Sequence, residues 1–443
     1  MKKVVIFLLM LHMLLLHTKV NVCAVERESE VVMIDEHSLF SQAAVLMDAR
    51  NGRVLFGKNQ DMQLAMASTT KIMTCIMALE KGDKNDLVTI SSYAASQPKV
   101  KLYLNKGERV RLNDLLYSLM LESHNDTAVA IAEHIGAKLL NVPNDPESAA
   151  KRTVAESQKA VKAFIDCMNQ KARELQCYHT WFITPNGLDA TETFYENDKE
   201  CLQKIHSTTA TELARMMSYC ILQSPEKEAF LKITGTYTYT FSNADETKSY
   251  TCSNHNAFLN MMDGAISGKT GYTGRAGYCY VGALERDGRY YVAALLNTGA
   301  YGNGNKNNKW KDMKKLMDYG LRYYKYETVY DGLIQAKPVI VLNAKKSPEK
   351  FYEDKIICPE ISGNEPIEIL LADWEKTEIK MKQEQKLIAP VSKGQKIGKV
   401  EVYLENLLLK QFDIIILEDI EEQKFSDILH YLIRKFCCLN IHM

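Results

Sequence analysis

Residues 67–74 read Ala-Ser-Thr-Thr-Lys-Ile-Met-Thr, so a serine and a lysine stand three positions apart where a polar segment gives way to an apolar helical run. Positions i and i+3 of a helix share a face, so the amine of Lys71 can reach the hydroxyl of Ser68. A serine hydroxyl needs a neighbouring base to become a nucleophile, and a lysine whose pKa is lowered by burial or a second cation can be that base. Ser68 and Lys71 are therefore candidates for acyl transfer. Taken alone, the same residues also describe a helix with an N-cap serine and an exposed lysine.

Two further polar groups follow in the chain. Residues 123–125 read Ser-His-Asn and interrupt an apolar helical stretch between residues 112 and 135. A joint between two helices, capped by Ser123 or Asn125, explains them equally well. Residues 268–271 read Gly-Lys-Thr-Gly, which suggests a phosphate-binding loop. That interpretation fails, because no earlier glycine has the required spacing and a strand rather than a helix is expected next.

Length and composition limit the function classes. The 443 residues suffice for two domains, and 46% of them are hydrophobic, enough for a substantial core. The 55 basic and 55 acidic side chains cancel, so overall charge gives no indication of a nucleic-acid partner.

The first 24 residues have the pattern of a secretory signal peptide. Lys2 and Lys3 precede an apolar run over residues 4–16, and Ala24 is a small residue at the expected cleavage point. A lipoprotein signal with acylated Cys23 is the alternative, although Val22 is bulky for one. Either way we expect the mature protein to lie outside the cytoplasmic membrane.

Eleven cysteines are scattered through the chain without Cys-x-x-Cys spacing or a nearby histidine in a metal-binding pattern. Their spread is typical of cysteine used as a small core residue. We therefore expect no metal and no required disulfide.

The remaining patterns predict two domains. Residues 36–330 combine helices with antiparallel hairpins at 42–57 and 277–296, which predicts an α+β fold; within them, the polar segment 141–158 looks like a loop. After a linker at 331–338, short alternating segments over 338–418 predict a small all-β sandwich. Residues 421–443 form an amphipathic helix, which either lies in a membrane interface or packs on its own domain or a partner.

In chain order, Ser68-x-x-Lys71, Ser123-x-Asn125 and Lys269-Thr270-Gly271 match the motif set of serine penicillin-recognising enzymes. The chain resembles the low-molecular-weight penicillin-binding proteins that act as serine-type D-alanyl-D-alanine carboxypeptidases. Residues 115–135, 184–189, 207–214, 264–277 and 389–395 extend the resemblance over nearly the whole mature chain. His124 is a departure, because the family usually has glycine there; we expect it to alter rate or preference.

The resemblance implies a role for each site residue. Lys71 would deprotonate Ser68, Ser123 would pass a proton to the leaving amine, and Asn125 would hold the substrate backbone and Lys71. The backbone N–H groups of Ser68 and Tyr272 would bind the oxyanion. Lys269 and Thr270, next to Gly271 on the same strand, would bind the terminal carboxylate of the substrate.

The implied partners are a peptidoglycan stem peptide ending in D-Ala-D-Ala and β-lactam antibiotics, with no cofactor. The implied setting is cell-wall biogenesis, remodelling and cell shape, at the outer face of the cytoplasmic membrane or in the wall. Alternatives are a β-lactamase, a transpeptidase or endopeptidase, and a catalytically silent penicillin-recognising sensor or scaffold.

Overall fold

In a computed structural model, the structure describes residues 33–196, 199–299, 305–347 and 350–438. The expected signal peptide, residues 1–24, lies outside the described residues. A short helical turn, η1 (Glu36–Ser38), begins the described chain.

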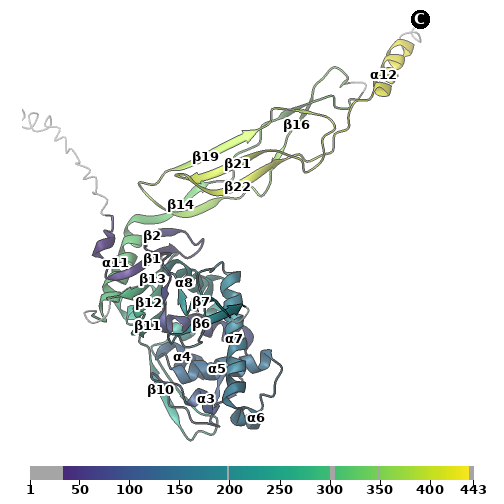
Figure 1. The fold of residues 1–443 in the computed structure, drawn as a ribbon. Coiled ribbons are helices and arrows are strands. Elements are labelled where there is room, and N and C mark those ends of the chain that lie inside the picture. The colour runs from purple at the N-terminus through teal and green to yellow at the C-terminus, as the bar shows by residue number, and fades with distance from the viewer. Residues whose placement is uncertain (1–32, 197–198, 300–304, 348–349, 439–443) are drawn as a thin grey trace, which may run out of the picture. The chain divides into compact units, whose positions relative to one another are not determined.

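A five-stranded antiparallel sheet organises the part of the chain up to residue 323, and Figure 1 shows its strands side by side. Its spatial order is β11 (Ala265–Thr273), β12 (Gly277–Arg286), β13 (Arg289–Thr298), β1 (Ser41–Asp48) and β2 (Val54–Lys58). Both predicted hairpins are confirmed: β1 pairs with β2, and β12 with β13. The β12–β13 turn uses Asp287 and Gly288 at φ 54° and 74°, the left-handed geometry that two-residue hairpin loops require.

Both faces of this sheet are covered, so residues 43–47 of β1 form an unbroken apolar run rather than an alternating one. Ala43, Val45 and Met47 belong to the main hydrophobic core, in which α8 (Ala210–Ser218) also takes part. The alternate residue Leu46 lies against Gly320 of α11 (Asn308–Tyr323). Because successive side chains of a strand point to opposite faces, α8 and α11 cover opposite sides of the sheet.

A helical region shares the main core with the sheet. At its centre lies α2 (Lys71–Lys81), in which every residue from Lys71 to Leu79 is buried. A helix that is buried on all sides needs neighbours on all sides. The surrounding helices are α4 (Leu112–Leu121), α5 (Asn125–Leu139), α7 (Val154–Glu174) and α9 (Lys227–Gly235).

Short elements connect these parts. The helical turns are η2 (Ala67–Thr70), α3 (Ser92–Ala95), α6 (Pro146–Lys151), the π-helical η3 (Tyr219–Gln223) and α10 (Phe258–Met261). The two-stranded pairs are β3 (Leu64–Ala65) with β8 (Ser207–Thr208), β4 (Leu87–Thr89) with β5 (Arg109–Arg111), β6 (Thr191–Glu196) with β7 (Lys199–Ile205), and β9 (Thr238–Ser242) with β10 (Ser249–Ser253).

The prediction of a loop over residues 141–158 is wrong. Asp145 caps α6 by accepting from the backbone of Glu147 and Ser148, with Pro146 as its first residue. Thr153 and Glu156 form a reciprocal capping box that starts α7. Local capping therefore makes this polar segment helical.

The later part of the chain is all β before a final helix. Its strands are β14 (Tyr324–Tyr330), β15 (Val339–Leu342), β16 (Lys355–Ile357), β17 (Glu360–Ile361), β18 (Ile367–Ala372), β19 (Thr377–Gln383), β20 (Lys386–Ile388), β21 (Lys396–Leu404) and β22 (Leu407–Ile415). They enclose a second core that includes Val341, Val402 and Phe412. Strand β14 pairs with β18, so the chain joins these sheets before the expected linker at 331–338.

The last described element is α12 (Phe425–Cys438), within the stretch expected to be amphipathic. No helix among the described residues is both long enough and apolar enough to cross a bilayer.

Candidate active site

Ser68 and Lys71 meet where η2 runs into α2. The apolar face of α2 draws this helix end into the core, and Lys71, its first residue, is 0% exposed. Nζ of Lys71 lies 3.0 Å from Oγ of Ser68. The predicted i, i+3 contact is therefore present, and the alternative with an exposed lysine is wrong.

Lys71 has two further acceptors, Oδ1 of Asn125 at 3.0 Å and the carbonyl oxygen of Asn186 at 2.6 Å. A neutral amine can donate to these two and keep its lone pair for the Ser68 proton. Burial, followed by the positive charge of Lys269, lowers the pKa of Lys71 well below its usual value, and Asp126 opposes this. The surroundings of Lys71 therefore favour a base.

Residues 122–124 connect α4 to α5 and hold Ser123 and Asn125 at the same place. Nδ2 of Asn125 donates to the carbonyl oxygens of Pro98 and Lys99, each at 3.2 Å, which leaves Oδ1 for Lys71. Ser123 has a φ of 71°, and among the described residues its buried Oγ has no hydrogen-bond partner. A buried hydroxyl in this condition is available to a ligand.

The third motif lies on β11, an edge strand of the sheet. A Cβ at residue 271 would lie 2.9 Å from the backbone nitrogen of Ser68, so Gly271 allows β11 to approach η2 closely. Lys269 is 1% exposed, donates to the carbonyl oxygen of Thr270 at 3.1 Å, and has its pKa lowered to about 7 by burial. It therefore lies within the wall of the site.

A pocket of about 610 Å³ opens over these groups. Of the predicted site residues, it is lined by Ser68, Ser123, Asn125, Thr270, Gly271 and Tyr272. The two buried amines, Lys71 and Lys269, lie behind this lining. Burial in the wall keeps both amines out of contact with bulk water.

Sequence reasoning missed several residues of the site. Residues 184–189 belong to the family resemblance, but nothing in their sequence predicts that the carbonyl oxygen of Asn186 binds Lys71. His255 and Lys309 also line the pocket. Burial, and then Lys306, lowers the pKa of Lys309 to about 8. No motif in the sequence marks Lys309.

His206 fixes the residue before Lys71. Its Nδ1 accepts from the backbone N–H of Ile183 at 2.9 Å, so Nε2 carries the proton and donates to Oγ1 of Thr70 at 2.7 Å. Burial, and then the charge of Lys71, lowers the pKa of His206 to about 3, so the ring is neutral. It joins the segment before Asn186 to η2.

Comparison with known proteins gives consistent matches. Residues 30–141 and 146–299 match a family described as D-alanyl-D-alanine carboxypeptidase, and residues 365–422 match the C-terminal domain of penicillin-binding protein 5. The D-alanyl-D-alanine carboxypeptidase DacF of Bacillus subtilis is 28% identical over 396 residues, 87% of each chain. DacC of Escherichia coli, of the same description, is 26% identical over 88% of this chain and 87% of its own.

Solved structures show the same fold. Penicillin-binding protein 5 of Haemophilus influenzae has a TM-score of 0.62 at 23% identity, covering 88% of this chain and all of its own. The Streptomyces K15 DD-transpeptidase has a TM-score of 0.52 at 25% identity, covering 66% of this chain and all of its own. The predicted fold class, an α+β penicillin-binding domain followed by a small β domain, is confirmed.

Proposed function

This chain belongs to the D-alanyl-D-alanine carboxypeptidase family, and on that premise we propose that Ser68 is the nucleophile with which it removes the terminal D-alanine of peptidoglycan stem peptides. The observation that carries the assignment is the 3.0 Å contact between Nζ of Lys71 and Oγ of Ser68 beneath the pocket. Lys71 is buried and its pKa is lowered, and both properties suit a general base.

In the acylation step, Lys71 takes the Ser68 proton and Oγ attacks the carbonyl carbon of the penultimate D-alanine. The resulting oxyanion needs donors that are already in place. We assign the backbone N–H groups of Ser68 and Tyr272. The close approach of Gly271 to the Ser68 nitrogen supports this pair, because it brings the two backbone segments together at the pocket.

Collapse of the tetrahedral intermediate requires a proton for the departing D-alanine. Ser123 lines the pocket and its Oγ has no partner among the described residues, which fits a relay from Lys71 to the leaving nitrogen. Asn125 binds Lys71 through Oδ1 and lines the pocket, so it can contact the substrate backbone too. Water then hydrolyses the ester and restores Ser68.

Lys269 and Thr270 are the proposed partners of the terminal carboxylate. Thr270 lines the pocket, whereas Lys269 lies directly behind it with its amine on the Thr270 carbonyl oxygen. A carboxylate bound at Thr270 would stabilise the charged form of Lys269. This positive charge would favour the binding of a substrate with a free C-terminus. It would favour the binding of a penicillin through its carboxylate in the same way.

Beyond the site itself, we propose a signal peptide at residues 1–24, action outside the cytoplasmic membrane in cell-wall remodelling, and attachment to the membrane surface through α12. The exposed apolar side chains of α12 support the last of these. They are Phe425, Leu429, Leu432, Ile433 and Phe436.

One assay tests the function and its alternatives. The protein is incubated with a pentapeptide ending in D-Ala-D-Ala and, separately, with a labelled penicillin. A carboxypeptidase releases D-alanine and keeps a long-lived penicilloyl adduct, a β-lactamase turns the penicillin over rapidly, and a silent sensor forms the adduct without releasing D-alanine. A transpeptidase instead transfers the peptide to an added amine acceptor, and an endopeptidase cleaves a cross-linked dimer.

Substitution at the nucleophile gives the sharpest result. Ser68→Ala should abolish both D-alanine release and the adduct, whereas Ser242→Ala, a change of an exposed serine on β9, should keep both. Survival of either signal in Ser68→Ala would refute the assignment of the nucleophile.

A further inference from the structure

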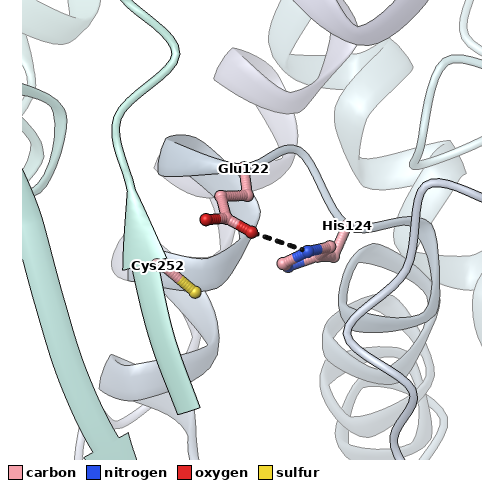
Figure 2. A group of neighbouring side chains, drawn as sticks. All are labelled: Glu122, His124 and Cys252. Atoms are coloured by element: carbon pink, nitrogen blue, oxygen red, sulfur yellow. Dashed lines mark ion pairs between the residues drawn. The ribbon is translucent and has the colours of Figure 1, made fainter.

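Three side chains capable of binding a metal converge beside the second motif, as Figure 2 shows. Glu122 ends α4, His124 follows it in the connection to α5, and Cys252 comes from β10. Their ligand atoms, a carboxylate oxygen, a ring nitrogen and the thiol sulfur, all lie within 4.8 Å of one another. In the described chain this is the sole such group. It is also where the chain departs from the family by having a histidine.

The first two ligands are already held in orientation. Nδ1 of His124 lies 2.8 Å from Oγ of Ser118, and Nε2 lies 3.2 Å from Oε2 of Glu122. Oε1 of Glu122 accepts from the backbone N–H of Ser253 at 2.8 Å, which ties it to the strand that carries Cys252. Metal-binding histidines commonly bond their second nitrogen to a polar group in this way, so that the other nitrogen faces the metal.

We propose that Glu122, His124 and Cys252 form a binding site for a Zn²⁺-class divalent cation. Carboxylate, imidazole and thiolate suit zinc, and three protein ligands leave a fourth position for water. On binding, the Cys252 thiol releases its proton to solvent and the sulfur bonds to the metal. The carboxylate and the thiolate then balance the two positive charges, so the buried site is neutral overall.

Spacing in the sequence predicts no metal site, because Cys252 is far from the other two ligands in the chain. Without a cation, burial, and then Glu122, raises the pKa of Cys252 to about 12, so the thiol keeps its proton. The side chains of Cys252 and His124 are almost fully buried, whereas that of Glu122 is 26% exposed and its residue lines the pocket. The pocket is therefore the route by which a cation reaches the site.

The position of the site couples it to the enzyme. His124 lies between Ser123 and Asn125, and the ligand atoms must close to within a few ångströms of one ion. Such closure draws the imidazole toward Cys252 and displaces the residues on either side. Bound metal therefore slows acylation of Ser68.

Titration of the full chain with Co²⁺ alone tests binding without reference to catalysis. One equivalent should produce an absorption band from thiolate-to-cobalt charge transfer, and Zn²⁺ should abolish it by competition. Cys252→Ala should lose the band. Ser118→Ala, which removes the hydrogen bond to Nδ1 of His124 together with one to Thr127, should weaken binding by about 10-fold or more. Cys220→Ala, a change of a buried thiol elsewhere in the same core, should leave the band unchanged.

Circular dichroism and thermal unfolding establish that each variant is folded. No band in the wild-type chain, or an equal band in folded Cys252→Ala, would overturn the site. Zn²⁺ should also slow labelling by penicillin several-fold in the wild type and in Cys220→Ala, and not in Cys252→Ala. Metal binding with no change in labelling would overturn the coupling to acylation. Neither spectroscopic result depends on carboxypeptidase activity, so a failure of this site is distinct from a failure of the proposed function.

Discussion

Gly187 packs so closely against Ala67 that a Cβ at residue 187 would lie 2.0 Å from the Ala67 carbonyl oxygen. Gly187 also has a φ of 85°, which disfavours any residue with a side chain. Its neighbour Asn186 supplies the carbonyl oxygen that binds Lys71. The contact therefore sets the distance between the 184–189 turn and the serine-bearing η2.

Gly187→Ala should displace the Asn186 carbonyl oxygen from Lys71 and slow penicillin acylation at least about 10-fold, since small misplacements of catalytic groups are costly. The rate is measured with a labelled penicillin at saturation and below it. The matched control is Gly52→Ala, because Gly52 has a φ of 77° but a Cβ at residue 52 would meet no other atom within 4 Å. Equal effects of the two changes would mean that backbone strain, rather than the contact with Ala67, is responsible.

The pH dependence of acylation should reveal the electrostatic coupling between the amines of Lys71 and Lys269. The rate should fall as pH falls through the lowered pKa of Lys71, because a protonated amine cannot accept the Ser68 proton. Lys269→Gln removes the cation that, after burial, depresses this pKa, so the acid limb should move to higher pH. Lys309→Gln removes a different cation of the pocket and should leave the position of the limb unchanged. An unmoved limb in Lys269→Gln would contradict the electrostatic coupling.

Removing one partner of a buried ion pair should destabilise the helical region. Nη1 of Arg152 lies 3.0 Å from Oε1 of Glu133, and the hydroxyls of Ser91 and Ser157 donate to the same carboxylate. Arg152→Met leaves this carboxylate charged and buried, so the free energy of unfolding in urea should fall by about 3–5 kcal/mol. The double variant Glu133→Gln/Arg152→Met should cost less than the sum of the single changes.

An exposed pair on the neighbouring helix provides the control. Lys151 and Glu147 form an i, i+4 contact on α6, with side chains 73% and 76% exposed. Lys151→Met should change the free energy of unfolding by less than about 1 kcal/mol. A similar cost for both changes would show that burial is not the deciding factor.

Membrane attachment should depend on the apolar side of α12. Full-length protein should sediment with vesicles of phosphatidylglycerol and phosphatidylcholine, whereas a chain ending at Gln423 should stay in solution. This end point keeps Ile420 and Glu422, which bridge to Val391 and Ala344. Leu429→Asp/Ile433→Asp should behave like the shortened chain, and sedimentation of that variant would exclude an apolar contact.

Much of the fold could be predicted from sequence, because its signals are local. The hairpins at 42–57 and 277–296 follow from short apolar runs joined by tight-turn glycines, and the core helices from their apolar spacing. The missed helix at 146–151 and the missed start of the helix at 154–174 are also locally encoded, in Pro146 and in the Thr153-Glu156 capping box. In that segment capping is a better guide to local structure than polarity.

In the candidate site, too, contacts encoded by local sequence are predictable and contacts between distant segments are not. Ser68 and Lys71 are one helical turn apart, so their contact follows from spacing, and the other motifs follow from the family resemblance. The acceptor at Asn186 is a backbone carbonyl oxygen. Every residue has one, so the identity of residue 186 does not predict this contact. Cys252 meets Glu122 and His124 only because β10 packs beside α4, and no spacing rule encodes that meeting.

The three hydrogen-bond partners of Lys71 have one more consequence, for the order in which the chain folds. Its bonds to Asn125 and Asn186 span 54 and 115 positions of sequence, so the amine is poised only after distant segments have docked. A half-assembled molecule would carry a solvated, protonated lysine and an inert serine. The fraction of molecules that penicillin labels covalently should thus report the fully folded population during refolding. This fraction should rise later than helical content recovers.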